Sequence, residues 1–277
     1  LTTRCYTQAC RSVPKIRYLD WISRTDPYSR MRKCHFAVFL CFAVLLVTTA
    51  VGQAPSRSQQ KADSIISGTT AMPDTTRVRI LNETGVSVFA SDLELARLLG
   101  NRALEQAVTA GYQKGEADAC RLLGNTHMRQ GQYVEALAMS RRALAIFEQL
   151  NNLNGKADAL NTIGMVYNQQ GQYPLALENF TRALDLRRQI DSTAPAPLLH
   201  ENIGIVYFGQ GDYQQALASF KECYEAYLAM GNEASANKVL VNIGATYNKL
   251  KMPQEALTAH KQSLSWFRKS NSVVGQA

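Results

Sequence analysis

The sequence predicts an all-α fold, a right-handed solenoid of antiparallel helical hairpins. The first observation is a repeat of forty residues, which places small residues at a constant interval: Gly124, Gly164, Gly204 and Gly244, and Ala136, Ala176, Ala216 and Ala256. The second observation is that each copy contains apolar residues at helical spacing, twice, with a turn between them. A period in this range is typical of stacked units that bury their apolar faces only against their neighbours.

Each unit is predicted to be two helices joined by a tight turn. Counted from Ala117 as place 1, places 4, 7, 8 and 11 form one helical stripe, which in the next copy consists of Leu160, Ile163, Gly164 and Tyr167. A Gln-Gly-Gln turn follows at 170–172. A second stripe then begins with small and aromatic residues, Ala176, Phe180 and Ala183. The small residues let the paired helices approach closely, and the aromatic rings fill the space between units.

The order of these residues resembles the tetratricopeptide repeat in a forty-residue form, and Gly171 and Tyr173 belong to the same pattern. The resemblance covers 77–276 and implies about five units: 77–116, 117–156, 157–196, 197–236 and 237–276. The first is degenerate, with Thr84 at the glycine place, as terminal repeats often are. Four residues depart from the pattern and are expected to weaken single interfaces: His127, Ser140, Pro253 and His260.

Residues 31–52 have the pattern of a secretory signal peptide. A basic start at 31–33 precedes an apolar run at 36–51, and small residues come just before Gln53. The run is shorter than the roughly 20 residues of a membrane-spanning helix, which favours cleavage over the alternative, an uncleaved signal-anchor. The expected location is therefore outside the cytoplasm, either periplasmic or associated with the membrane on its non-cytoplasmic side.

The segments around the signal are interpreted separately. Residues 1–30 are expected to be non-native upstream sequence without a fold, with translation starting at Met31. Residues 53–75 are rich in Ser, Thr and Gln and predict a tether, weakly helical over 60–67, ahead of an N-cap at 74–76. The last residues repeat the phase of 154–157, so a further unit is expected beyond Ala277.

The charge distribution argues against a nucleic-acid partner, and the positions of the cysteines argue against a disulfide bond. The formal net charge is +8, but residues 1–35 contain eight Lys or Arg against two Asp, whereas the remainder contains 22 against 20 acidic residues. The repeats are thus nearly neutral, and no nucleic-acid partner is expected. Cys120 and Cys223 lie in different units, so we predict two buried thiols rather than a disulfide.

No catalytic motif is present, so the sequence predicts neither an enzyme nor a cofactor. It lacks a phosphate loop, the His-Glu-x-x-His pattern, the Gly-x-Ser-x-Gly pattern and a Cys-x-x-Cys pair. Three histidines, His127, His200 and His260, occupy packing places in three different units, so no metal site is expected.

A partner-binding surface is predicted on the concave side, where first helices of successive hairpins lie. Places 2, 5, 9 and 12 share one face, where Asn amides can pair with a peptide backbone and apolar side chains can contact its residues. The candidates are Arg121, Asn125, Asn161, Met165, Asn168, Glu201, Ile205, Phe208, Lys238 and Asn248. The alternative is that Met165, Ile205 and Phe208 belong to the core between repeats. Some tetratricopeptide proteins clamp a terminal carboxylate, but Thr162 stands where that clamp needs Asn, so such binding is not predicted.

The sequence therefore predicts an exported, non-catalytic scaffold that binds a protein or peptide, with membrane contact only through the signal or a missing downstream anchor. The alternative follows from a resemblance to exported bacterial sensor proteins. In that interpretation the chain is the truncated input region of a membrane-bound histidine kinase or nucleotide cyclase whose catalytic domain lies beyond residue 277.

Overall fold

The computed structural model describes residues 55–274, with side chains described as far as 270, and this part of the chain consists of helices without strands. The predicted signal, the segment before it and the last three residues lie outside this range. The helices are α3 (Arg57–Gly68), α4 (Asp74–Val88), α5 (Leu93–Thr109), α6 (Gln113–Arg129), α7 (Tyr133–Gln149), α8 (Leu153–Gln169), α9 (Tyr173–Ile190), α10 (Pro197–Gln210), α11 (Tyr213–Ala229), α12 (Glu233–Lys249) and α13 (Pro253–Val274). None of these helices is long and apolar enough to cross a membrane.

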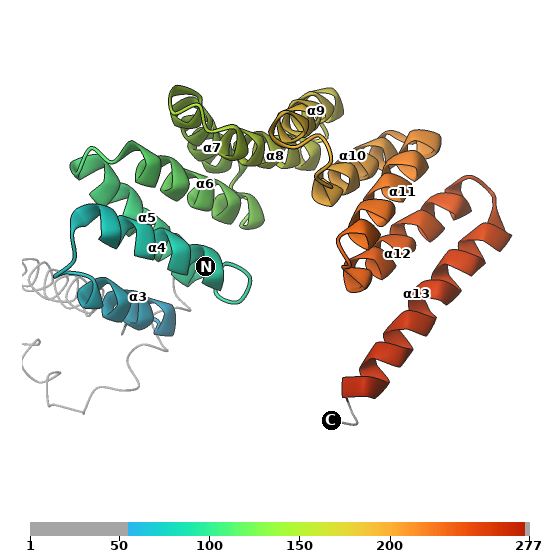
Figure 1. Cartoon of the computed structure of the whole chain (residues 1–277), viewed down its shortest axis with the longest axis horizontal. Helices are drawn as coiled ribbons and strands as arrows, with labels where there is room; N and C mark the ends of the chain where they lie inside the picture. The colour runs from blue at the N-terminus through green and yellow to red at the C-terminus, as the bar shows by residue number, and fades with distance from the viewer. Residues whose placement is uncertain (1–54, 275–277) are drawn as a thin grey trace, which may run out of the picture. The chain divides into compact units, whose positions relative to one another are not determined.

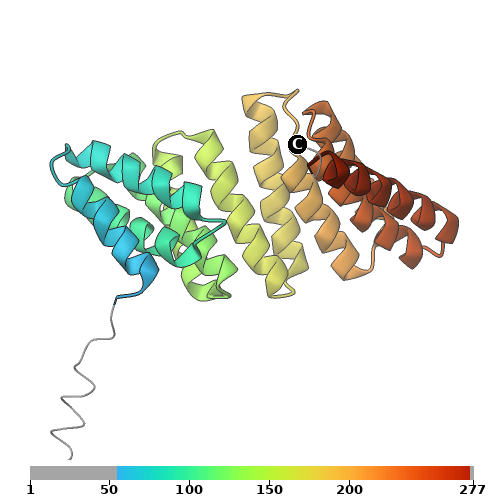
Figure 2. The ribbon, with the colours of Figure 1, turned by 90° about the horizontal axis from the view of Figure 1, so that it is seen from below.

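The helices pack as five successive hairpins, which confirms the predicted α-solenoid. The pairs are α4 with α5, α6 with α7, α8 with α9, α10 with α11 and α12 with α13, and each pair packs on the next in chain order. Figures 1 and 2 show the hairpins side by side in chain order, which the colours follow. Successive first helices also contact one another, α4 with α6, α6 with α8 and α8 with α10, whereas successive second helices in the described residues have no contact of similar extent.

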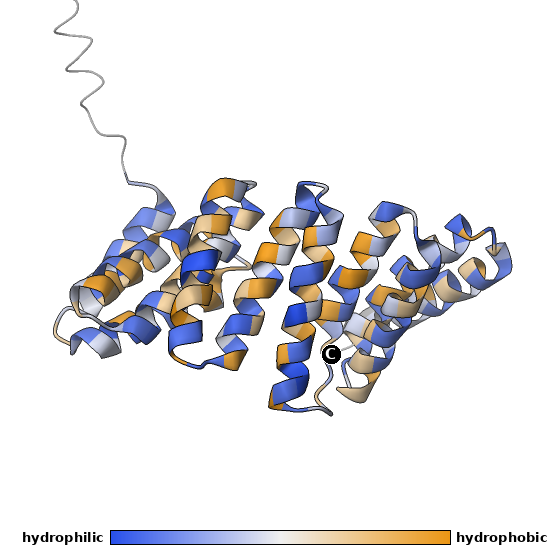
Figure 3. Ribbon diagram, turned by 90° about the horizontal axis from the view of Figure 1, so that it is seen from above, coloured by the Kyte–Doolittle hydropathy of each residue, from blue (hydrophilic) through white to orange (hydrophobic). Residues whose placement is uncertain are grey.

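Apolar and polar residues alternate along each helix, as Figure 3 shows, and the buried ones follow the predicted stripes. Leu160, Ile163 and Gly164 are buried in α8, and Ala176, Phe180 and Ala183 are buried in α9. The turn between α8 and α9 contains Gly171 at a φ of +72°, a conformation that a residue with a Cβ rarely adopts. Turn and stripe together fix how the two helices face each other.

The closest approach within a hairpin is between the glycine at place 8 and the residue at place 24. A Cβ added to Gly164 would lie 2.7 Å from the ring of Phe180, and one added to Gly204 would lie 2.7 Å from Phe220. The two departures at place 24, Ser140 and His260, occupy the same position, and a Cβ added to Gly244 would lie 2.5 Å from the His260 ring. These contacts explain why the position accepts no side chain.

The first unit differs from its sequence alignment by one residue. The repeat pattern assigns the glycine place to Thr84, but the residue that packs closely on the neighbouring helices is Gly85. Ala96, Leu99 and Leu122 surround it. The turn from α4 to α5 also differs, with four residues at 89–92 where the turn from α6 to α7 has three.

The segment predicted as a tether contains α3, a packed helix that the sequence indicated only weakly over 60–67. Ala62 is fully buried, and Ile65 and Ile66 pack on the core of the first hairpin. The Ser58 hydroxyl donates to the Asp92 carboxylate at 2.9 Å and thereby ties α3 to the start of α5. The tether prediction failed here because three apolar residues on one helix face outweigh the polar composition around them.

The N-cap predicted at 74–76 is also one residue off. The residue before α4 is Pro73, which has no side-chain capping bond, and Asp74 is the first helical residue. Arg77 stabilises this junction instead, because its guanidinium donates to the backbone carbonyls of Thr69, Thr70 and Met72.

Cys120 and Cys223 are free and buried, as predicted. Burial raises the pKa of the Cys120 thiol to about 11 and that of Cys223 to about 12. Both therefore remain protonated at neutral pH and act as small apolar residues of the core.

We expect Gly164→Ala to lower the free energy of unfolding by about 1–3 kcal/mol, because the added methyl group forces the Phe180 ring out of its place. Urea denaturation followed by circular dichroism measures the change. Gly68→Ala is the matched control, since a Cβ there meets nothing within 4 Å. Equal stabilities for both variants would contradict the close-packing explanation.

Candidate partner-binding surface

The first-helix face is formed by the exposed sides of α4, α6, α8, α10 and α12. It is the face on which the sequence placed all ten candidate residues. The structure divides it into three parts: a polar middle on α6 and α8, an apolar part on α10 and α12, and a charged cavity between α4 and α6.

In the polar middle, two predicted asparagines bond to the next repeat. The Thr162 hydroxyl donates to Asn125 Oδ1 at 2.7 Å, and Asn202 Nδ2 donates to Asn161 Oδ1 at 2.8 Å. The acceptor atoms of Asn125 and Asn161 are therefore already engaged between repeats. Their amide Nδ2 groups form no hydrogen bond within the described part of the chain, so they retain donors for a partner. The sequence did not predict these inter-repeat bonds.

The predicted cation Arg121 lies in a chain of ion pairs. Its guanidinium is 3.8 Å from Asp118 and 4.0 Å from Asp158, and Asp158 also pairs with Arg187 at 2.5 Å. Burial raises the pKa of Asp118 above its ordinary value, and Arg121 and Lys114 oppose that effect. Because Arg121 is held by two carboxylates, it offers less charge to a partner than the sequence suggested.

The apolar patch consists of Leu198, Ile205 and Phe208 of α10 and Val241 of α12. Leu198 is 61% exposed, Ile205 41% and Val241 49%. Phe208 packs edge to face on Tyr213, with ring centroids 5.3 Å apart. A cavity of about 150 Å³ lies between the two helices and is lined by Ile205, Phe208, Phe220, Asn242 and Ala245.

The patch continues into a second hollow where α10 is shorter than the other first helices. α8 begins at Leu153, but the corresponding residues before α10 are a loop that contains Pro195, and α10 begins only at Pro197. Proline restricts the residue before it to extended backbone, so the first helical turn cannot form. The missing turn opens a cavity of about 350 Å³, lined by Ala157, Asp158, Asn161, Arg187, residues 194–199, Tyr227 and Met230. The two prolines are the sequence signal for this hollow, and the repeat pattern alone did not predict it.

The remaining candidates divide between core and surface. Met165 packs on the core of the third hairpin and Phe208 packs on the core of α11 and α12, as the alternative interpretation stated, whereas Ile205 remains exposed. Lys238 and Asn248 are exposed, and Asn168 is half-buried. Glu201 is half-buried and forms no side-chain hydrogen bond or ion pair in the described part, and burial raises its pKa.

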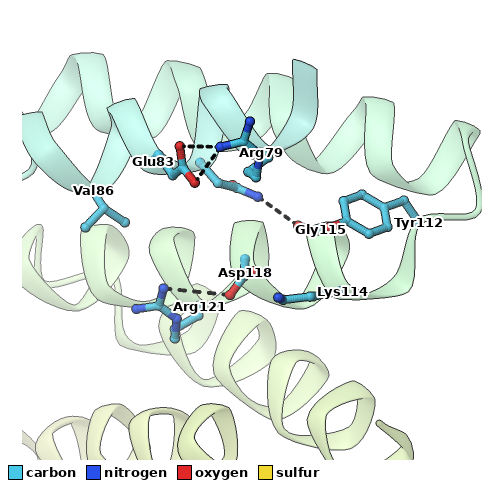
Figure 4. Close-up of a pocket in the computed structure, with 9 residues that line it drawn as sticks. Arg79, Glu83, Val86, Tyr112, Lys114, Gly115, Asp118 and Arg121 are labelled. Carbon is cyan, nitrogen blue, oxygen red and sulfur yellow. Dashed lines mark hydrogen bonds and ion pairs between the residues drawn. The ribbon is translucent and has the colours of Figure 1, made fainter. Parts of the chain in front are cut away.

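At the other end of the face, a cavity of about 340 Å³ lies between α4 and α6 (Figure 4). Its lining contains charged, polar and apolar side chains: Arg79, Asn82, Glu83, Val86, Tyr112, Lys114, Gly115, Asp118 and Arg121. Only Arg121 among these was a candidate. Except for Asp118, the others belong to the first unit and were missed because that unit was treated as degenerate. The sequence signal was Gly85, which lies one residue out of phase with the glycines of the other units.

No group of histidine, cysteine and acidic residues that could hold a metal ion occurs among the described residues. The three histidines have separate partners. His127 contacts Gln132 at 2.6 Å, His200 pairs with Glu222 at 2.8 Å, and His260 packs against Gly244.

Comparison with known proteins agrees with this architecture. Residues 116–189 and 161–227 match two family models, each described as tetratricopeptide repeat. No curated protein matches the chain. The crystal structure of BtubC (BKLC) from P. vanneervenii is 17% identical, with 77% of this chain and 89% of that chain covered and a TM-score of 0.63.

Two further solved structures are similar. A Rap protein complexed with Competence and Sporulation Factor is 16% identical, covering 74% of this chain and 57% of that one at a TM-score of 0.64. A signal transduction ATPase of Pyrococcus horikoshii with a tetratricopeptide repeat sensor is 12% identical, covering 83% of this chain and 35% of that one at a TM-score of 0.64. At these identities the likeness concerns the fold alone.

We expect Glu201→Gln to raise the free energy of unfolding at neutral pH. Because burial raises the pKa of Glu201 in the folded state, the ionised side chain lowers stability as the pH rises through that value. The gain should disappear as the pH falls below the ordinary glutamate pKa of about 4.3, where both states are protonated. Urea denaturation across this range tests it, with the exposed Glu225→Gln as the control for loss of a charge. A gain that is constant with pH would contradict the argument.

Proposed function

Because this chain is a tetratricopeptide repeat protein, we propose that it is an exported, non-catalytic scaffold that binds a protein or peptide partner on its first-helix face. The observation that carries the proposal is the apolar patch, in which the exposed Leu198 and Ile205 each line a cavity and Val241 remains exposed on the next first helix. An exposed apolar group of this kind is typical of a surface that another molecule covers.

The polar groups in the middle of the first-helix face suit an extended segment. Free amide donors on Asn125 and Asn161 can bond to peptide carbonyl groups, as the edge of a strand does. The cavity of about 150 Å³ accommodates one apolar side chain. Backbone recognition would supply affinity, and the cavities would select the side chains.

Export rests on the signal pattern at 31–52, and N-terminal sequencing of the exported protein should find a mature start close to Gln53. A second candidate is the input region of a larger signalling protein. It is favoured by the fold likeness to the Pyrococcus horikoshii protein, whose repeats are described as a sensor. The coding sequence after Ala277 distinguishes the two, since only the second requires a catalytic domain there.

Replacing two residues of the patch tests the binding surface. Peptides are selected against the full chain by display, and their affinity is then measured by fluorescence anisotropy. We expect Leu198→Asp with Val241→Asp to weaken binding at least about tenfold, because each buried apolar side chain contributes about 1.5–3 kcal/mol.

The matched control is Val134→Asp with Leu257→Asp, which introduces the same charges on second helices at exposed apolar residues. The control should bind as the wild type does, and circular dichroism should show equal helix content for both. Equal loss of affinity in both double variants, or none in either, would exclude the first-helix face as the site.

A further inference from the structure

The cavity between α4 and α6 contains an acceptor that the protein leaves unused. Asn82 is only 6% exposed, and its Nδ2 donates to the Gly115 carbonyl at 3.0 Å. A carbonyl oxygen accepts but cannot donate, so the amide must turn its NH₂ group to Gly115. Its Oδ1 atom is then buried in the wall of the cavity without a hydrogen-bond partner.

The charged side chains of the cavity cancel in pairs, with one exception. Arg79 binds Glu83 in the same helix at 3.1 Å, and Arg121 lies 3.8 Å from Asp118. Lys114 forms no ion pair among the described residues and is exposed at the start of α6. Figure 4 shows its side chain on the same side of α6 as Asp118. The five charged side chains thus sum to one positive charge, with Lys114 acting on the nearby Asp118, and the cavity also contains one acceptor without a hydrogen-bond partner.

The N-terminus of α6 adds to the positive charge of the cavity. Its N-cap residue, Tyr112, makes no side-chain capping bond, whereas the Asn152 side chain caps α8. The uncapped amide groups at a helix start carry partial positive charge. Tyr112 and the exposed Val86 provide apolar surface beside the charge.

A ligand for this cavity needs a neutral N–H donor for Asn82 and a negative charge for Lys114. The cavity has a net positive charge, which disfavours a free ammonium group, so an uncharged donor suits Asn82 better. An anion without a donor would leave Asn82 Oδ1 unpaired. A peptide segment supplies both, through its backbone amide and an acidic side chain.

We propose that the cavity between α4 and α6 binds an acidic peptide segment, with a backbone N–H donating to Asn82 Oδ1 and an Asp or Glu carboxylate pairing with Lys114. An aliphatic residue next to the acidic one lies against Val86 and Tyr112. The proposal deepens the proposed function by specifying one part of the partner. It uses a site separate from the apolar patch.

The first test compares two sets of short peptides with acetylated and amidated ends, one with Asp or Glu at a fixed position and one with Asn or Gln. We expect the acidic set to bind the full chain at least about tenfold more tightly and Lys114→Glu to abolish that preference. Lys261→Glu is the control, because it makes the same charge change at an exposed residue of α13. The control should keep the preference.

The second test replaces single peptide amides by esters in the tightest acidic peptide. We expect one ester to weaken binding to the wild type by about tenfold and to have no further effect on Asn82→Ala, since only the wild type has the acceptor. Circular dichroism confirms that Asn82→Ala is folded. Should that variant unfold, the result with Lys114→Glu still decides the matter.

Three results would overturn the proposal. They are equal binding of the two peptide sets, a Lys114→Glu affinity within about twofold of that of Lys261→Glu, and displacement of the peptide by inorganic phosphate, which would indicate a phosphate site. The proposed function fails separately, because it depends on Leu198→Asp with Val241→Asp. If Leu198→Asp with Val241→Asp abolishes binding and Lys114→Glu has no effect, the proposed function stands and the acidic-segment proposal is excluded.

Discussion

The structure depends on one constraint: a single hairpin cannot cover its own apolar stripes. In the third hairpin, Leu160 and Phe180 are almost fully buried only because α8 and α9 lie between neighbouring hairpins. The glycine at place 8 brings the paired helices close enough for this burial, and the bulky residue at place 24 fills the space. Stability is then a sum of contacts between nearest neighbours along the row.

The same constraint determines where a partner can bind. Residues at the stacking places are buried in the core and are not available to a partner. Asn125 and Asn161 use their carbonyl oxygens in hydrogen bonds between repeats. Cavities of some 340–350 Å³ occur where the repeat is irregular. One lies beside α4, whose glycine is out of phase, and the other lies beside the shortened α10. Both of these concave sites therefore accompany departures from the repeat.

The sequence was sufficient for the repeated parts of the fold. The forty-residue spacing of Gly164 and Gly204 predicted the close approaches, and the Gln-Gly turns predicted where each hairpin bends. It was insufficient in the first unit, because Gly85 lies one residue beyond the glycine place and the repeat pattern therefore shows no glycine there. It was also insufficient for side-chain partners. Arg121 looks like a free cation in the sequence, but two carboxylates from different helices hold it.

The central claim is tested most directly by removing the last hairpin, α12 and α13, and measuring urea denaturation of both proteins. If hairpins are stable only through their neighbours, the shortened protein should show a lower free energy of unfolding and a smaller denaturant slope, because less surface is buried. The separate peptide 153–190, which forms α8 and α9 in the protein, should have little helix. An unchanged free energy, or a separate hairpin that unfolds cooperatively, would contradict the account.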